Sequence, residues 1–198
     1  MNLVTTCNYE EPEFNIKEIL RYSGTKETTN EIDNLLYNCI TEAKDKLSYK
    51  VCYSSFPIKF TDAYIDLGFT KTTSKNLRTN LENCENIILF AATIGIGIDR
   101  LISKYCITSP SKAVMLQAIG AERIESLCNI FNTELATKMN SQDKKLAPRF
   151  SPGYGDLPLE IQSDIFRVLN CSTKIGLTLN KSLLMTPTKS VTAIIGIQ

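Results

Sequence analysis

The 198-residue chain contains no histidine and no tryptophan. Because the chain has no imidazole, it cannot form Ser-His-Asp or Cys-His catalytic groups or histidine-containing zinc sites, and it cannot use histidine in acid/base catalysis. The chain also has no large excess of positive or negative charge: it contains 22 Lys and Arg residues and 21 Asp and Glu residues, which gives a net charge of +1. Proteins that bind nucleic acids normally carry a basic surface. We therefore expect no nucleic-acid partner and no catalysis that depends on an imidazole.

Long hydrophobic runs are absent as well. The longest run spans residues 87–98 and is interrupted by Thr93, Gly95 and Gly97, whereas a membrane-spanning helix needs about 20 apolar residues. The first residues lack the basic and apolar segments of a secretory signal. We therefore expect a cytoplasmic protein that has no membrane partner.

The seven cysteines show no metal-binding or redox spacing. No two of them are closer than 13 residues, so the chain has no CxxC motif, and their number is odd. A chain of this length does not need disulfides to stabilise it. We expect most of these thiols to be reduced and buried, and we expect no metal site.

The remaining composition is that of an ordinary globular domain. Hydrophobic residues make up 43% of the chain and charged residues 22%, which is enough apolar surface for a hydrophobic core. No internal repeat or low-complexity linker divides the sequence. We therefore predict a single domain over residues 1–198.

Hydrophobic periodicity predicts an irregular mixture of helices and strands. Helices are expected where apolar residues recur every three or four positions, and strands where β-branched and aromatic residues concentrate. Because the two kinds of element do not alternate regularly, the fold class is predicted to be α+β. The expected helices cover residues 15–22, 29–47, 73–84, 99–106, a long segment from 110, and 156–169; the expected strands cover 49–56, 64–67, 86–93, 182–185 and 190–197.

Three local signals refine these boundaries. Ser109-Pro110 is typical of a helix start, with serine as N-cap and proline at the first helical position. Asp156, followed by Pro158, predicts another N-cap at the start of the helix that ends at residue 169. Gly120 lies inside the long helix, where glycine costs about 1 kcal/mol relative to alanine, so we expect a packing reason for it.

The turn at Gly95 and Gly97 follows an apolar strand and precedes a helix, as in many nucleotide sites. However, the sequence TIGIGID lacks the third glycine of GxGxxG, and no GK[ST] follows it. The turn has two interpretations. It either binds a nucleotide or simply connects a strand to a helix whose first turn contains Asp99, and we favour the second.

The strongest signal is the loop APRFSPGYGDLP, residues 147–158. Its prolines and glycines restrict the backbone and display Arg149 and Tyr154. An arginine fork suits a carboxylate or phosphate, and a tyrosine ring offers an apolar face beside a cation. The backbone at Pro152-Gly153 can contact the edge of a heterocycle. On residue types alone, a rigid loop with a surface arginine remains an equally good interpretation.

The same loop resembles the activation domain of cobalamin-dependent methionine synthase. That family has an Arg-x-x-Pro-Gly-Tyr loop, a proline-capped helix and a later strand with a Ser-Val element. The segments AIGAERIESL and NIILFAATIG resemble its long helix and core strand, and the resemblance covers most of the chain. The matching motif residues are Arg149, Pro152, Gly153, Tyr154, Pro158, Ser190 and Val191.

This resemblance implies a fold in which mixed helices pack on a central, largely antiparallel sheet. It also implies a function. The family binds S-adenosylmethionine and presents it to an oxidised cob(II)alamin, which regains its methyl group with an electron from flavodoxin or a similar donor. The chain is then a component of methionine synthase activity rather than a self-sufficient enzyme, with no catalytic residue of its own and with cobalamin supplied by a partner chain.

The resemblance also implies roles for individual residues. Arg149 would hold the methionine carboxylate, Glu125 would accept from the ammonium or a ribose hydroxyl, and Tyr154 would lie near the sulfonium and the corrin face. The backbone at positions 150–152 would meet the adenosine. The predicted S-adenosylmethionine site therefore consists of Arg149, Phe150, Ser151, Pro152, Gly153, Tyr154 and Glu125.

Two other functions remain open at this stage. The chain lacks a counterpart of the hairpin that contributes tyrosines to the ligand site in multidomain members, so we expect a compact, stand-alone form that acts in trans. Such a form could instead be a non-catalytic module that docks on a corrinoid protein without a nucleotide. A self-contained methyltransferase that uses the Gly95–Gly97 turn is a less favoured alternative.

Overall fold

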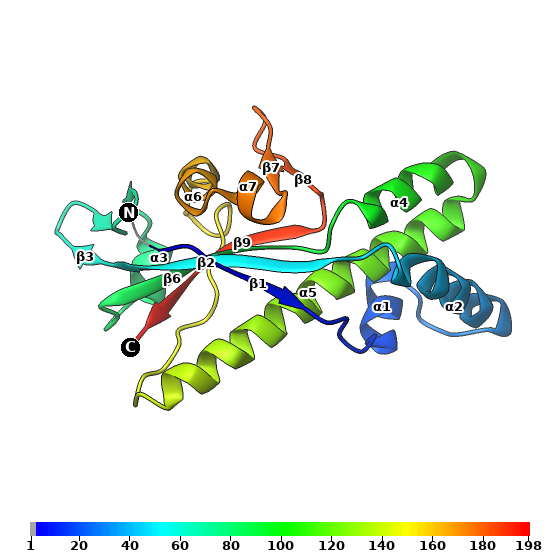
Figure 1. Ribbon diagram of the computed structural model, residues 1–198, viewed down its shortest axis with the longest axis horizontal. Coiled ribbons are helices and arrows are strands. Elements are labelled where there is room, and N and C mark those ends of the chain that lie inside the picture. Colours follow the sequence, from blue (N-terminus) through cyan, green and yellow to red (C-terminus); the bar gives the residue numbers. More distant parts are fainter. Residues whose placement is uncertain (1–2) are drawn as a thin grey trace.

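The computed structural model describes residues 3–198 and is built on one four-stranded antiparallel sheet. The strand order is β1-β2-β6-β9, and every neighbouring pair in this order is antiparallel. Helices pack on this sheet, which confirms the predicted α+β class (Figure 1). The strands of the sheet are β1 (Thr5–Tyr9), β2 (Tyr49–Pro57), β6 (Asn86–Thr93) and β9 (Ser190–Ile197).

Strand β6 is apolar because helices and loops cover both faces of the sheet. Its residues alternate between two cores: Phe90 belongs to one hydrophobic cluster and Leu89 to the other, and both side chains are fully buried. A strand covered on both faces needs apolar side chains at every position rather than at every second one. The predicted strand at 86–93 is therefore confirmed with the predicted bounds.

Four helices cover the first face of the sheet. The longest, α5, crosses beneath the strands, and the other three gather near one end of it (Figure 1). The rings of Phe131 on α5 and Phe90 on β6 lie 4.9 Å apart and anchor the helix to the sheet. These helices are α1 (Ile16–Ser23), α2 (Asn30–Lys44), α4 (Gly97–Thr108) and α5 (Pro110–Asn140).

Shorter elements cover the second face and form the other hydrophobic cluster. Ile165 of one helix and Leu77 of another are fully buried against the sheet. Two small sheets, β3-β4-β5 and β7-β8, flank these helices. The elements are α3 (Lys75–Asn80), α6 (Ile161–Leu169), α7 (Cys171–Ile175), β3 (Lys59–Phe60), β4 (Ile65–Asp66), β5 (Lys71–Thr72), β7 (Thr178–Leu179) and β8 (Met185–Thr186).

Several predicted boundaries were wrong. Helix α3 is half the expected length, with its predicted N-cap Ser74 accepting a hydrogen bond from the backbone N–H of Leu77. Asp156 does not cap the helix that follows it, because α6 begins only at Ile161. The short strand expected at 182–185 is instead β8, which pairs with β7. Propensity sets where an element forms, but tertiary contacts set where it ends.

Strand β1 was not predicted at all. Its sequence, TTCNY, has little apolar alternation, and its side chains are only half-buried or exposed. The strand exists because it pairs with β2, with Cys7 opposite Val51. A pairing between residues 40 to 48 positions apart leaves no local signal in the sequence.

The cysteines lie mostly in the interior of the fold, as the sequence predicted. All seven cysteines are free thiols, and five of them are buried. Burial raises the pKa of the Cys128 thiol to about 12, although Arg149 nearby acts in the opposite direction.

None of the helices between residues 3 and 198 combines the length and the hydropathy that a membrane-spanning helix needs.

Candidate functional site

The loop that carries Arg149 is fixed to the edge of the central sheet. Phe150 and Ile194 of β9 exchange two backbone hydrogen bonds of 2.9 Å, and Ala147 donates to the carbonyl of Gly196 at 2.9 Å. Residues 145–150 therefore extend the sheet beyond β9. Because Ala147 and Phe150 on either side of it are held in this way, Arg149 has a defined position from which its side chain reaches α5.

Arg149 contacts two polar residues of α5. Its Nη2 atom lies 3.2 Å from Oε2 of Glu125 and 3.0 Å from Oδ1 of Asn129. The Arg149 side chain is 26% exposed and that of Glu125 44% exposed, so solvent reaches the pair. A half-exposed ion pair contributes little to stability, and a ligand can replace either partner. The structure thus brings together two of the residues that the sequence singled out.

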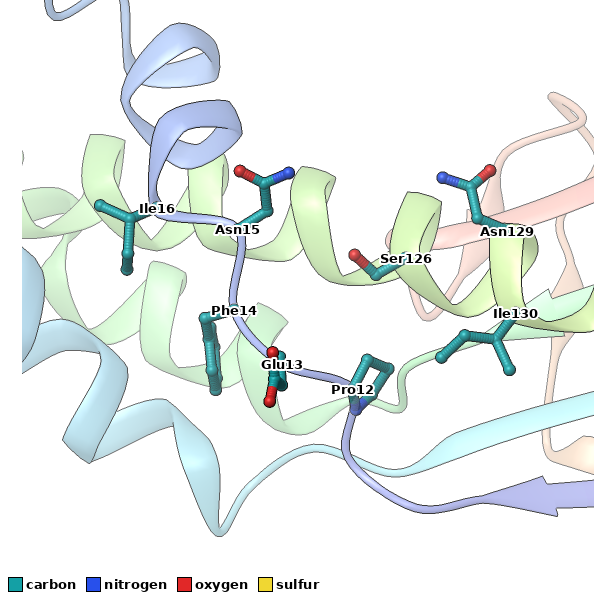
Figure 2. A pocket seen from close by; sticks show the side chains of 8 residues that line it. All are labelled: Pro12, Glu13, Phe14, Asn15, Ile16, Ser126, Asn129 and Ile130. Carbon is teal, nitrogen blue, oxygen red and sulfur yellow. The ribbon is translucent and has the colours of Figure 1, made fainter.

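These residues line a cavity of about 250 Å³ between α1, α5 and the Arg149 loop. A second cavity, of about 540 Å³, adjoins it and lies between residues 12–16 and α5 (Figure 2). The two cavities share Asn15, Ser126 and Asn129, so we treat them as one groove, the α1–α5 groove. Its combined size suits a small molecule. The first cavity is lined by Asn15, Glu18, Tyr22, Glu122, Glu125, Ser126, Asn129 and Arg149.

Two amide groups present donors to the α1–α5 groove. Oδ1 of Asn15 accepts a hydrogen bond from the N–H of Glu18, and Oδ1 of Asn129 accepts from Arg149. Because each oxygen has a partner, the NH₂ end of each amide is the end left for the groove. Figure 2 shows these two nitrogens turned toward each other, with Ser126 between them. The groove therefore offers hydrogen-bond donors beside the carboxylate of Glu125.

The rest of the predicted site lies outside these two cavities. The ring of Tyr154 is 69% exposed and packs edge-on against Phe150, with the ring centres 5.4 Å apart. The backbone N–H and carbonyl of Phe150 are both engaged by β9. The carbonyl of Ser151 is engaged as well, because it accepts a hydrogen bond from the backbone N–H of Tyr154 at 3.1 Å. Pro152 is buried, and Gly153 adopts a positive φ of 83°.

Asp156 fixes the far end of the loop by capping a helix distant in sequence. Its carboxylate accepts from the hydroxyl of Ser74 and from the backbone N–H groups of Lys75, at 2.7 Å, and Asn76, at 3.2 Å. The hydrogen bond from Ser74 is the main cause that lowers the pKa of Asp156, and the two backbone donors act in the same direction. A carboxylate is favoured at a helix N-terminus. Asp156 thus joins the Arg149 loop to α3.

The Gly95–Gly97 turn is filled by the chain itself. A Cβ atom at Gly97 would collide with the backbone carbonyl of Lys46, and one at Gly95 with the hydroxyl of Ser48. Asp99 accepts hydrogen bonds from the N–H and hydroxyl of Thr188, at 2.7 and 2.6 Å. The glycines allow close packing between segments. The turn connects β6 to α4 with Asp99 in the first helical turn, as the interpretation favoured from the sequence has it.

The sequence missed the contribution of α1 to the groove. Asn15, Glu18 and Tyr22 line it although they precede Arg149 by more than 120 residues. The only sequence signal was Asn15 as the start of a helix, which gives no indication of what the helix faces.

Within the described part of the chain, no three His, Cys, Asp or Glu side chains are grouped so that they could hold a metal ion.

Comparisons with known proteins bear on the fold and on the family. A family model described as "Vitamin B12 dependent methionine synthase, activation domain" matches residues 77–198, well over half of the chain. The fold is similar to a crystal structure of the MetH reactivation domain bound to AdoHcy, with a TM-score of 0.67 and 14% sequence identity. That similarity covers 98% of this chain and 78% of the other. No curated protein sequence matches.

Proposed function

Because the chain belongs to the family of activation domains of vitamin B12-dependent methionine synthase, we propose that it binds S-adenosylmethionine and supports reductive methylation of cob(II)alamin in trans. The corrinoid would be carried by a methionine synthase chain or a related corrinoid protein. A flavodoxin-like or other donor would supply the electron. The packing of both faces of one sheet supports a single domain over residues 1–198.

The observation that carries this proposal is the contact of Arg149 with Glu125 and Asn129 at the α1–α5 groove. The amino-acid end of S-adenosylmethionine has one carboxylate and one ammonium. The carboxylate can take the Arg149 fork, and the ammonium can take Glu125. Binding would thus replace the weak ion pair between Arg149 and Glu125 with two ion pairs between the protein and the ligand.

The groove also suits the rest of the ligand. The NH₂ groups of Asn15 and Asn129 can donate to the carboxylate or to ribose oxygens. Ile16 and Ile130 give the adjoining cavity an apolar wall (Figure 2). The family resemblance assigns the backbone at positions 150–152 to the adenosine, and we place the adenosine at Ser151 and Pro152, just outside the two cavities. When bound, S-adenosylmethionine supplies the methyl group, and its sulfonium is already a good leaving group, so this chain needs no acid/base residue.

Tyr154 has a separate role in this proposal. Its side chain is exposed and makes an edge contact with the ring of Phe150. We assign it to the corrin face of the partner, beside the sulfonium. Binding of the nucleotide and docking of the corrinoid would then use neighbouring parts of one loop.

Isothermal titration calorimetry with S-adenosylmethionine and S-adenosylhomocysteine tests the proposal. Arg149→Ala should weaken binding at least about tenfold, because it removes a charge-assisted bidentate contact. The matched control is Arg167→Ala, which removes an exposed arginine paired only with Asp164 of its own helix. No binding by the unmodified chain, with and without a corrinoid domain, would overturn the proposal.

The same variants separate the two alternative functions. Co-purification with a corrinoid protein that does not change with nucleotide or with Arg149→Ala would indicate a docking module instead. The methyltransferase alternative has less support, because residues 46 and 48 pack beside Gly95 and Gly97.

A further inference from the structure

A buried ion pair lies in the middle of α5, directly behind the α1–α5 groove. Arg123 is fully buried and Glu122 is 2% exposed. Nε of Arg123 lies 2.6 Å from Oε2 of Glu122, and Nη2 lies 2.6 Å from Oε1. The two residues are adjacent in sequence, and adjacent helical residues do not normally face each other. The arrangement therefore depends on what surrounds the pair.

The guanidinium of Arg123 contacts the segment that precedes α1. Nη1 donates to the carbonyl of Pro12 at 2.5 Å, and Nη2 donates to the carbonyl of Glu13 at 2.6 Å. The centre of the guanidinium lies 4.0 Å from the ring centre of Phe14. One side chain thus contacts three consecutive residues that lie about 110 positions earlier in the chain.

Glu122 continues this attachment on the groove side. Its Oε1 atom accepts hydrogen bonds from the backbone N–H of Asn15, at 3.3 Å, and from the hydroxyl of Ser126, at 2.6 Å. Together with the contacts to Arg123, these bonds occupy the carboxylate. Glu122 lines the cavity but has little capacity left for a ligand, in contrast to the half-exposed Glu125.

The energetics of the pair point to a role in positioning. Burial acts to lower the pKa of Arg123, but the hydrogen bonds and charge of Glu122 outweigh it and raise the pKa above its ordinary value. Burying two charges is costly, and apolar residues often stabilise a core as well or better. What apolar residues cannot do is hold two backbone carbonyls and an N–H at fixed places.

We infer that Arg123, with Glu122, is a positioning residue for the ligand groove: it holds residues 12–15 against α5 so that the amide of Asn15 faces that of Asn129. Neither residue of the pair contacts the ligand in this proposal. The inference rests on the proposed function, because the ligand it assumes is S-adenosylmethionine. It adds a residue of α5 that acts through the segment preceding α1.

Two variants test it. Arg123→Lys keeps the charge but cannot reach Glu122, Pro12 and Glu13 together, because lysine lacks the planar fork. Phe14→Leu removes the ring stacked on the guanidinium and leaves an apolar side chain where Phe14 lines the larger cavity. The control, Ile165→Val, lies on the opposite face of the sheet and makes a small change in a fully buried side chain. It shows the effect of a modest loss of stability alone.

Three measurements are made on each folded variant: the thermal midpoint, the affinity for S-adenosylmethionine by calorimetry, and hydrogen exchange of residues 13–18 with and without ligand. Arg123→Lys should weaken binding about tenfold or more, the equivalent of one lost charge-assisted hydrogen bond. It should also abolish the protection that ligand gives to residues 13–18. Phe14→Leu should act in the same direction to a smaller extent, and Ile165→Val should change neither property.

The outcomes separate this inference from the proposed function. If the unmodified chain does not bind S-adenosylmethionine, the proposed function fails. If the unmodified chain binds it, and Arg123→Lys and Phe14→Leu bind within about twofold of it, only the positioning role is overturned. If Arg123→Lys does not fold, Phe14→Leu decides the question, because Phe14 is only partly buried.

Discussion

The side chain of Lys189 lies across Gly120 in the middle of α5. A Cβ atom at Gly120 would lie 2.9 Å from Cε and 3.0 Å from Cγ of Lys189. Burial lowers the pKa of Lys189, although the negative charge of Asp99 acts in the opposite direction. This contact is the packing reason that the sequence predicted for a glycine inside a long helix, and it joins the start of β9 to α5.

The contact can be tested by a double-mutant cycle. Gly120→Ala in the otherwise unmodified chain should lower the free energy of unfolding by about 1 kcal/mol, because the added methyl group displaces the half-buried Lys189. In a chain that already carries Lys189→Ala, Gly120→Ala should instead raise the free energy of unfolding by up to about 1 kcal/mol, because alanine has the higher helix propensity. Urea unfolding measures both values. Additive effects would show that the two residues are not coupled.

Asp156→Asn tests the link between the Arg149 loop and α3. Because the folded pKa of Asp156 is lowered, first of all by Ser74, the ionised form stabilises the fold above the ordinary pKa of about 3.9. That stabilisation is lost as the pH falls through the lower folded value. The variant should therefore have a lower thermal midpoint than the unmodified chain at pH 7, and the difference should shrink as the pH falls below about 4.

Thermal unfolding across this pH range makes the measurement. Asp62→Asn is the control, since Asp62 is an exposed aspartate of the same charge. A pH-independent difference for Asp156→Asn would mean that the charge of Asp156 does not matter to α3.

Gly97→Ala should lower the free energy of unfolding more than Gly24→Ala does. Gly24 has a φ of 75° but open space around it, so alanine there should cost about 1 kcal/mol of backbone strain. At Gly97 the new Cβ would meet the carbonyl of Lys46, and moving backbone should cost about 2 kcal/mol or more. Denaturant unfolding ranks the two, and an equal or smaller cost at Gly97 would contradict the tight packing of this turn.

Two aromatic residues of the Arg149 loop should separate stability from function. Tyr154→Ala should change the free energy of unfolding by no more than about 0.5 kcal/mol, because the ring is mostly exposed. Phe150→Ala should cost about 3–5 kcal/mol, because its ring is buried in the core. Under the proposed function, Tyr154→Ala should still slow methylation of a partner's cob(II)alamin. The absorption spectrum of the corrinoid measures the rate. An unchanged rate would remove Tyr154 from the site.

The sequence was most informative where the structure depends on local geometry. The strand at 86–93 follows from its apolar run, and α5 begins at Pro110, directly after Ser109, as predicted, although the side chain of Ser109 makes no capping hydrogen bond. The Arg149 loop was identified from its prolines, glycines and family motif. Such signals exist because backbone dihedrals and hydrophobic burial act on residues that are neighbours in the chain.

Contacts between distant segments decided the rest. The sequence could not show that Asp156 caps α3 rather than its own helix, that β1 pairs with β2, or that Arg123 holds the segment before α1. Each of these contacts joins residues tens to more than a hundred positions apart, and neither partner has an unusual local pattern.

By itself, the sequence determined the class of fold, the family and the loop that carries Arg149. It also showed, through the absent histidine, that this chain does no imidazole chemistry. Only the tertiary structure decided what Arg149 faces: Glu125 and Asn129 on α5, with Asn15 across the groove. The reason is that a binding groove is formed by surfaces from several elements, and their relative placement is fixed by packing on a shared sheet rather than by any one segment.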